Sequence, residues 1–324
     1  MHSSVFFKIF PPPKFIIMPH AGLDISDDAM RCLDYTLGSR GWTIHRYATE
    51  DLPPGIIEGG DIKNEKELIS RLTAFGKKNN LSFVKISLPE EKAYLFQTEV
   101  PKTDVRSMVL NIESKLEENV PLAAADAVFY FDLLPSQETV NGVRASVSVV
   151  SRAYIEKLIF ILQSAGLVPM AFETSPRSIT RAVVPPLSEE TQLIVHIMKK
   201  KIGLYIVAED VVHFTETIIR EQADNSSSDA NSMTASALMK EIIRVYTYWI
   251  SRGDVKGSIS KVILIGKEAP TFEMIMRSSA TVDMPPITVA NVWQNALDLS
   301  HYVPPISLQD SLEYGITAGL ALPL

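Results

Sequence analysis

The spacing of hydrophobic residues over positions 22–91 predicts one half of an α/β layer. Apolar and polar residues alternate in three short segments separated by turn-forming residues, which is typical of an antiparallel strand meander. Hydrophobic residues then recur at helical spacing, with Asn64 placed to cap the helix, before a last apolar strand. The expected strands are 22–25, 29–35, 42–47 and 82–88, and the expected helix is 64–78.

The segment 92–172 predicts a compact α+β unit inserted into this half. Its helix at 104–119 has Thr103 or Asp104 as a cap and one apolar stripe to bury. Because both of its helices lie between strands in the sequence, we expect one sheet covered by two helices. The second helix is expected at 153–165 and the strands at 93–100, 127–134, 143–150 and 168–173.

The second half repeats the strand meander after a proline pair at 185–186. A polar stretch at 221–232 predicts a loop. The helix expected at 234–251 is apolar over such a wide arc that we expect it to be buried. The remaining expected elements are strands at 191–198, 202–208, 211–219, 261–265 and 287–290 and helices at 176–184, 270–278 and 311–320.

Composition excludes several classes of protein. Hydrophobic residues make up 46% of the chain and charged residues 21%, which excludes fibrous and wholly disordered classes. The net charge of −7, without a long block of Lys or Arg, argues against a nucleic-acid partner. The longest stretch without a charged residue, 158–172, has 15 residues, whereas a membrane span needs about 20. The single cysteine, Cys32, favours a reducing cytosolic compartment.

Six short segments then occur in a fixed order: GLDIS at 22–26, LPPGIIEGGDI at 52–62, ISLPEEKAY at 86–94, SAGLVP at 164–169, VANV at 289–292 and YGITAGLAL at 314–322. In this order and at this spacing they resemble the type IV pilus assembly protein PilM family, which is part of the actin-like ATPase superfamily and is related to the division protein FtsA. The resemblance implies an α/β fold of two actin-like (ribonuclease H-like) subdomains. It places an α+β subdomain inside the first and leaves the small helical subdomain of the second half reduced or absent.

The resemblance also implies how the chain divides. We expect an N-terminal extension at 1–21, whose apolar residues pack on the domain that follows, and the alternative is that they contact a membrane or a partner. The first actin-like subdomain is expected to comprise 22–91, 173–187 and 311–324. The inserted subdomain is expected at 92–172 and the second actin-like subdomain at 188–310.

A role in pilus assembly follows from the same resemblance. It implies a cytoplasmic adaptor, peripheral to the inner membrane, that binds the cytoplasmic N-terminal tail of a PilN-like single-pass membrane protein and connects it to the pilus motor ATPase. In the family that tail binds as an extended peptide in the groove between the first subdomain and the insertion. Homo-oligomerisation, and the choice between a pilus, a secretion and a competence system, stay open.

The nucleotide positions of the family are altered in this chain. The resemblance places Asp24, Ser26, Lys199 and Gly266 in the cleft, with Asp24 as the candidate metal ligand. Ser26 stands where the family has a glycine that lets the backbone approach a phosphate. His196 and Met198 replace a carboxylate and a glycine in the second phosphate hairpin, and Lys267 and Glu268 replace two glycines of the adenosine segment.

Two charged turns in this region have alternative interpretations. We expect Asp27 and Asp28 to form a solvated hairpin turn, and the alternative is that they help to hold a cation. The lysines at 199–201 are expected to form a solvated turn, and the alternative is that they attract phosphate. The departures together predict a pseudo-ATPase without catalytic residues, to which ATP and Mg²⁺ bind weakly or not at all. The alternative function is an active, ATP-binding actin-like ATPase in division, secretion or competence.

Overall fold

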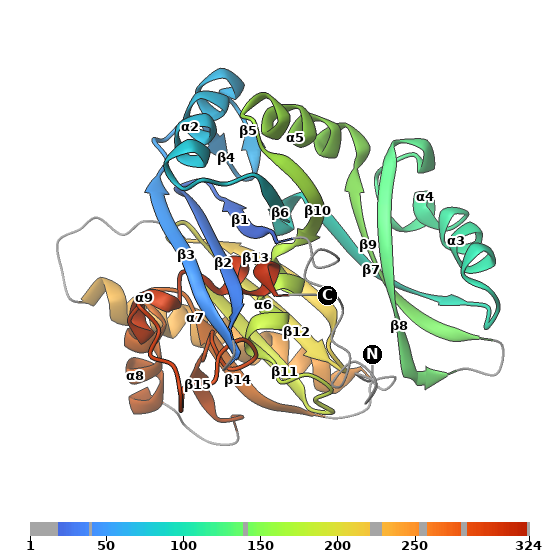
Figure 1. Ribbon diagram of the computed structural model, residues 1–324. Helices are drawn as coiled ribbons and strands as arrows, with labels where there is room; N and C mark the ends of the chain where they lie inside the picture. The colour runs from blue at the N-terminus through green and yellow to red at the C-terminus, as the bar shows by residue number, and fades with distance from the viewer. Residues whose placement is uncertain are drawn as a thin grey trace.

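Three β-sheets and one short ribbon organise the molecule (Figure 1). The computed structural model describes residues 19–38, 41–138, 142–220, 229–252, 258–279 and 284–322. Within these residues two sheets have five strands and one has three, and β4 (Ile57–Glu58) pairs with β5 (Asp61–Ile62) as the ribbon. None of the helices in this part of the chain is long and apolar enough to cross a bilayer.

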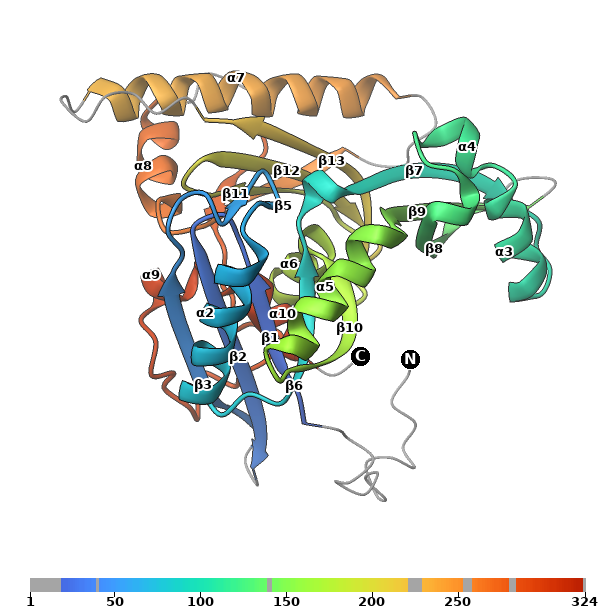
Figure 2. The same ribbon diagram turned by 90° about the horizontal axis from the view of Figure 1, so that it is seen from above.

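The first sheet has the strand order β10-β6-β1-β2-β3. Its antiparallel meander continues into β6, which lies parallel to both β1 and β10. Helices α2 and α5 pack on one face, and α6 and α10 lie on the other, between the two large sheets (Figure 2). The elements are β1 (Ala21–Ile25), β2 (Ala29–Gly38), β3 (Gly41–Asp51), β6 (Phe83–Leu88), β10 (Val168–Thr174), α2 (Glu65–Lys78), α5 (Arg152–Ser164), α6 (Ser175–Val183) and α10 (Gly315–Ala321).

The second sheet repeats this plan with the order β13-β12-β11-β14-β15. One hydrophobic core joins it to α6 and α10 on its inner side and to α7 and α8 on its outer side, so the two halves share buried surface. Ile179 of α6 and Leu320 of α10 are buried on the inner side of this core, and Trp249 of α7 is buried on the outer side. The elements are β11 (Thr191–Ile197), β12 (Lys201–Ala208), β13 (Val211–Ile219), β14 (Ile259–Ile265), β15 (Ile287–Val289), α7 (Asp229–Ser251), α8 (Ala269–Ser279) and the short α9 (Leu308–Ser311).

The inserted unit is a three-stranded sheet with the order β7-β9-β8. Helices α3 and α4 cover one face and bury Met108, Ile112 and Leu116 against β9. Asp104 caps α3 as expected, since its carboxylate accepts the Ser107 backbone N–H at 3.1 Å. The elements are β7 (Ala93–Val100), α3 (Val105–Glu113), α4 (Leu116–Asn119), β8 (Ala127–Glu138) and β9 (Val143–Ser151), preceded by the 3₁₀ turn η1 (Glu90–Lys92) and interrupted by the turn η2 (Ala124–Asp126).

The inserted unit is smaller than the sequence predicts. Strand β10 pairs in parallel with β6, and α5 buries Leu158, Ile161 and Leu162 in the first core, so both elements join the first sheet. Alternation along a strand does not reveal which sheet the strand joins. The prediction that the helix at 153–165 and the strand at 168–173 belong to the inserted unit was therefore wrong. The helix expected at 104–119 is also divided, because the Ser114 hydroxyl donates to the Asn111 carbonyl at the end of α3.

The long helix α7 differs from its prediction in two ways. It begins at Asp229, within the stretch expected to be a loop, while residues 221–228 lie outside the described part of the chain. Its inner face is buried as expected, but Ile243 is 44% and Ile250 52% exposed. The wide apolar arc is only half covered, because α7 lies along the outer surface of the second sheet (Figure 2). The expected terminal helix is likewise two short helices, α9 and α10.

Candidate functional site

A cavity of about 400 Å³ lies between the two halves. The turn between β1 and β2, the turn between β11 and β12, the residues after β14 and those before α10 all line it. The four residues that the resemblance assigns to the nucleotide cleft, Asp24, Ser26, Lys199 and Gly266, are all among these lining residues.

The β1–β2 turn uses its polar groups to support its own conformation. The Ser26 hydroxyl accepts the Ala29 backbone N–H at 3.2 Å and donates to the Asp28 carboxylate at 2.9 Å. The Asp27 carboxylate accepts the backbone N–H groups of Gly59 and Gly60 at 2.7 and 3.1 Å. Asp27 therefore anchors the turn between β4 and β5 and is not simply a solvated charge. Sequence reasoning missed this contact.

Asp24 is buried at the end of β1. It is 6% exposed, and the Ser87 hydroxyl donates a hydrogen bond to its carboxylate. Burial raises the pKa of Asp24, although the Ser87 bond opposes the change. Among the residues that the structure describes, no three His, Cys, Asp or Glu side chains gather as a metal site would require.

The β11–β12 turn brings an apolar and a neutral side chain to the cavity. The Met198 N–H donates to the Lys201 carbonyl at 3.0 Å, which closes the turn and leaves the Met198 side chain at the cavity wall. Burial, assisted by the positive charges of Lys201 and Arg31, lowers the pKa of His196 to about 3. His196 is therefore uncharged at neutral pH. Lys199, at the tip of the turn, is exposed as expected.

Lys201 does not belong to a solvated turn. Its side chain is 13% exposed and forms an ion pair with Glu91, while the Glu90 carboxylate lies 3.9 Å away. The Tyr205 hydroxyl donates to Glu90 at 3.1 Å. Burial opposes the charge on Lys201, but Glu90 and Glu91 outweigh it and raise the pKa of the ammonium group. The lysine prediction was thus wrong for this residue.

Gly266 is required by the backbone at its position. Its φ is +114°, and a Cβ atom there would lie 2.0 Å from the Ile197 carbonyl oxygen. The next residue, Lys267, is 66% exposed and lies 3.9 Å from Glu313. Glu268 accepts two hydrogen bonds from Arg220, at 3.1 and 2.9 Å. Arg220 is a second residue that sequence reasoning missed.

The charges around the cavity are mixed, and many are paired. Acidic residues outnumber basic ones by seven to five. Within the described part of the chain, five ion pairs involve these groups: Arg31 with Glu313 at 3.0 Å, Arg220 with Glu268 at 2.9 Å, Lys201 with Glu91, and the longer contacts of Lys201 with Glu90 and of Lys267 with Glu313, both at 3.9 Å. The acidic residues are Asp24, Asp27, Asp28, Asp51, Glu90, Glu268 and Glu313, and the basic ones are Arg31, Lys199, Lys200, Lys201 and Lys267.

A second candidate site is the outer edge of β10, formed by the backbone of 168–174. In the described part of the chain β10 pairs with β6 alone, at the end of the first sheet. Val168 is 47% and Met170 38% exposed along this edge. An edge strand with exposed apolar residues can pair with another extended chain.

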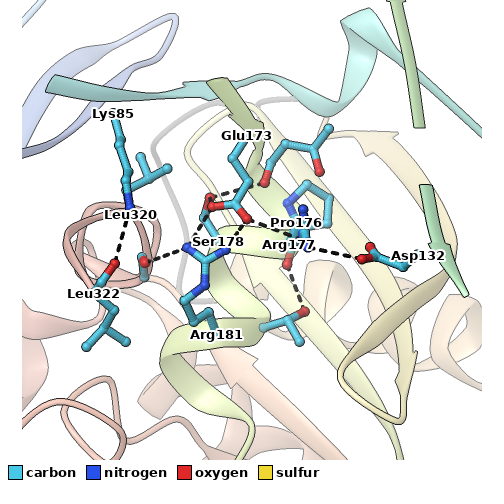
Figure 3. A network of polar contacts seen from close by, with 12 residues as sticks. Lys85, Asp132, Glu173, Pro176, Arg177, Ser178, Arg181, Leu320 and Leu322 are labelled. Carbon is cyan, nitrogen blue, oxygen red and sulfur yellow. Dashed lines mark hydrogen bonds and ion pairs between the residues drawn. The ribbon is translucent and has the colours of Figure 1, made fainter. Parts of the chain in front are cut away.

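A network of polar contacts fixes the inserted unit beside β10 (Figure 3). The Glu173 carboxylate, at the end of β10, accepts hydrogen bonds from Arg181 and lies 3.4 Å from Arg177. Arg177 in turn donates to Asp132 of β8 at 3.1 Å and lies 4.6 Å above the Tyr130 ring. Arg181 also donates to the Gly319 carbonyl of α10 at 3.0 Å, so one buried carboxylate connects β10, α6, β8 and α10.

Comparison with known proteins supports the fold at low sequence identity. No protein-family model and no curated protein matches the chain. Among solved structures, the "PilM-PilN type IV pilus biogenesis complex" superposes with a TM-score of 0.75 at 17% identity, covering 94% of this chain and 98% of that one. The chain has the PilM fold.

Two other structures superpose less closely. EutJ, an ethanolamine utilization protein from Carboxydothermus hydrogenoformans, has a TM-score of 0.48 at 10% identity, covering 96% of this chain and 90% of its own. The cytoplasmic domain of EpsL, from the type II secretion system of Vibrio cholerae, has a TM-score of 0.46 at 10% identity, covering 91% of this chain and 93% of its own.

The PilM fold therefore contains two candidate sites in this chain, the cavity between the halves and the β10 edge. The residues that the resemblance assigns to the nucleotide cleft lie together in the cavity. The partners that neutralise its charges, Glu91 and Arg220, and the network around Glu173 appear only in three dimensions.

Proposed function

We propose that the protein is a cytoplasmic adaptor of type IV pilus assembly that binds the N-terminal tail of a PilN-like inner-membrane protein and connects it to the pilus motor. The superposition on a PilM–PilN complex is the observation that supports this role. It leaves only about 6% of the chain, roughly 19 of 324 residues, without a counterpart. The inserted unit, from β7 to β9, is longer than 19 residues. Most of it therefore also has a counterpart in that complex.

The β10 edge is suited to an extended tail. A peptide that adds a strand to β10 gains main-chain hydrogen bonds, and alternate side chains fix its register. Val168 and Met170 supply apolar contact along this edge, and the Arg177–Asp132 pair holds the inserted unit beside it. These features agree with the family's use of the junction between the first subdomain and the insertion.

The cavity is proposed to be a degenerate nucleotide site. A triphosphate is a polyanion and needs cations or backbone N–H groups that are available to it. Here Lys201, Arg220 and Arg31 are paired with protein carboxylates. Met198 adds a side chain where the family backbone approaches phosphate. The alternative, an active ATPase, would require this cavity to accept Mg-ATP.

Calorimetric titration of the full chain with the synthetic cytoplasmic tail of a PilN-like protein from the same organism tests the adaptor role. We expect a saturable complex that Met170→Asp weakens about tenfold or more, because a carboxylate would enter an apolar contact. Met274→Asp is the matched control, since Met274 is 67% exposed on α8, which is an element of the second half. If no tail binds, or if both variants bind as the native chain does, the proposal is wrong.

A further inference from the structure

Three charged residues bridge the two halves beside the cavity, and two of them, Glu90 and Lys201, line it. Glu90 and Glu91 lie in η1, which connects the first sheet to the inserted unit. Lys201 is the first residue of β12 in the second half. Its Nζ atom donates a hydrogen bond to the Glu91 carboxylate and lies 3.9 Å from the Glu90 carboxylate. We refer to Glu90, Glu91 and Lys201 as the cleft bridge.

The cleft bridge is removed from water. The exposed fractions of the side chains are 4% for Glu90, 18% for Glu91 and 13% for Lys201. Two adjacent carboxylates would repel each other, and the ammonium group between them offsets this repulsion. The Tyr205 hydroxyl adds a hydrogen bond to Glu90 from the second half. Breaking such a buried pair leaves an uncompensated charge, and the contact therefore resists separation of the halves.

A second ion pair across the cavity is much weaker. Lys267 of the second half lies 3.9 Å from Glu313, which precedes α10, but the lysine side chain is 66% exposed. Solvent-exposed pairs of this kind contribute little to stability. Of these two contacts across the cavity, the buried one at Lys201 therefore resists separation of the halves more strongly.

We propose that the cleft bridge holds the two halves together without a bound ligand, in the place where a nucleotide would otherwise connect them. The Lys201 ammonium group supplies a positive charge from the second half, and Glu90 and Glu91 supply the opposing charges from the first. The arrangement keeps one closed conformation in which η1 and the inserted unit are fixed beside β10. This inference goes beyond the adaptor role and rests on the proposed absence of nucleotide, not on the identity of the partner.

Hydrogen–deuterium exchange of the full chain without nucleotide tests the bridge. Lys201→Met retains most of the side-chain length but removes the charge. We expect amide exchange near the cavity, in β6 and around the β11–β12 turn, to accelerate about tenfold or more. Lys200→Met is the matched control, because Lys200 is an exposed lysine in the same turn. We expect it to change exchange by less than about twofold.

Two further variants distinguish loss of the cleft bridge from general unfolding of the chain. Glu91→Gln removes one carboxylate and leaves Glu90 to face Lys201, and we expect a smaller acceleration in the same segments. Lys201→Glu combined with Glu91→Lys restores opposite charges and should recover much of the protection lost in Lys201→Glu alone. Equal exchange in native, Lys201→Met and Glu91→Gln proteins would overturn the proposal. Uniform acceleration over the whole chain, with no excess at the cavity, would also overturn it. Tail binding is measured separately, so failure of the bridge would leave the adaptor role standing.

Discussion

At the scale of single residues, one glycine of the cavity is required by the backbone, whether or not a ligand binds there. Gly266 lies where the family has an adenosine segment, yet its positive φ and its contact with the Ile197 carbonyl already require glycine. The sequence placed Asp24, Ser26, Lys199 and Gly266 in one cavity through the resemblance. It did not predict the bond from Lys201 to Glu91, because the two residues are 110 positions apart and no local pattern connects them.

Gly266→Ala tests the structural role of this glycine. We expect the free energy of unfolding to fall by about 3 kcal/mol, since the new methyl group meets a backbone carbonyl in a conformation that alanine rarely adopts. Gly55→Ala is the control, because Gly55 also has a positive φ of +86° but no heavy atom within 4 Å of the added Cβ. Its cost should be nearer 1 kcal/mol. Urea denaturation of both variants measures the difference, and equal losses would contradict the assignment of a close contact.

At the scale of elements, Glu173 explains how the inserted unit is fixed to the rest of the molecule. The carboxylate is 8% exposed and holds two arginines of α6, one of which reaches β8 and the other α10. Most strands and helices could be predicted from their periods, because alternation and helical spacing are local. The sheet that β10 joins could not, because pairing with β6 depends on residues some 80 positions away.

Glu173→Gln tests the contribution of this carboxylate. We expect a loss of about 3 kcal/mol in the free energy of unfolding, because two arginines would lose their shared countercharge in a buried setting. Glu67→Gln is the comparison, since Glu67 pairs with Arg71 at 2.7 Å on the exposed side of α2. That loss should be below about 0.5 kcal/mol. Thermal and urea unfolding provide the values, and a Glu173→Gln loss no larger than that of Glu67→Gln would refute the role given to the network.

At the scale of the whole molecule, the chain has the PilM fold, and the proposal is that its cavity no longer binds a nucleotide. One hydrophobic core passes from the first half through α6 and α10 into the second sheet, so the arrangement of the halves has support beyond any ligand. The cavity between them is lined by more carboxylates than cations, and two of its buried cations, Arg31 and Lys201, are paired with protein carboxylates. The central claim is therefore that this architecture serves partner binding without a nucleotide.

Calorimetric titration of the purified full chain with Mg-ATP is the most direct test of that claim. The charges and the Met198 side chain at the cavity predict no saturable heat at millimolar ATP and no thermal stabilisation, since a ligand that binds only the native state would raise the melting temperature. Micromolar binding, with a thermal shift that Asp24→Ala abolishes, would show that the cavity is a working nucleotide site and would contradict the account.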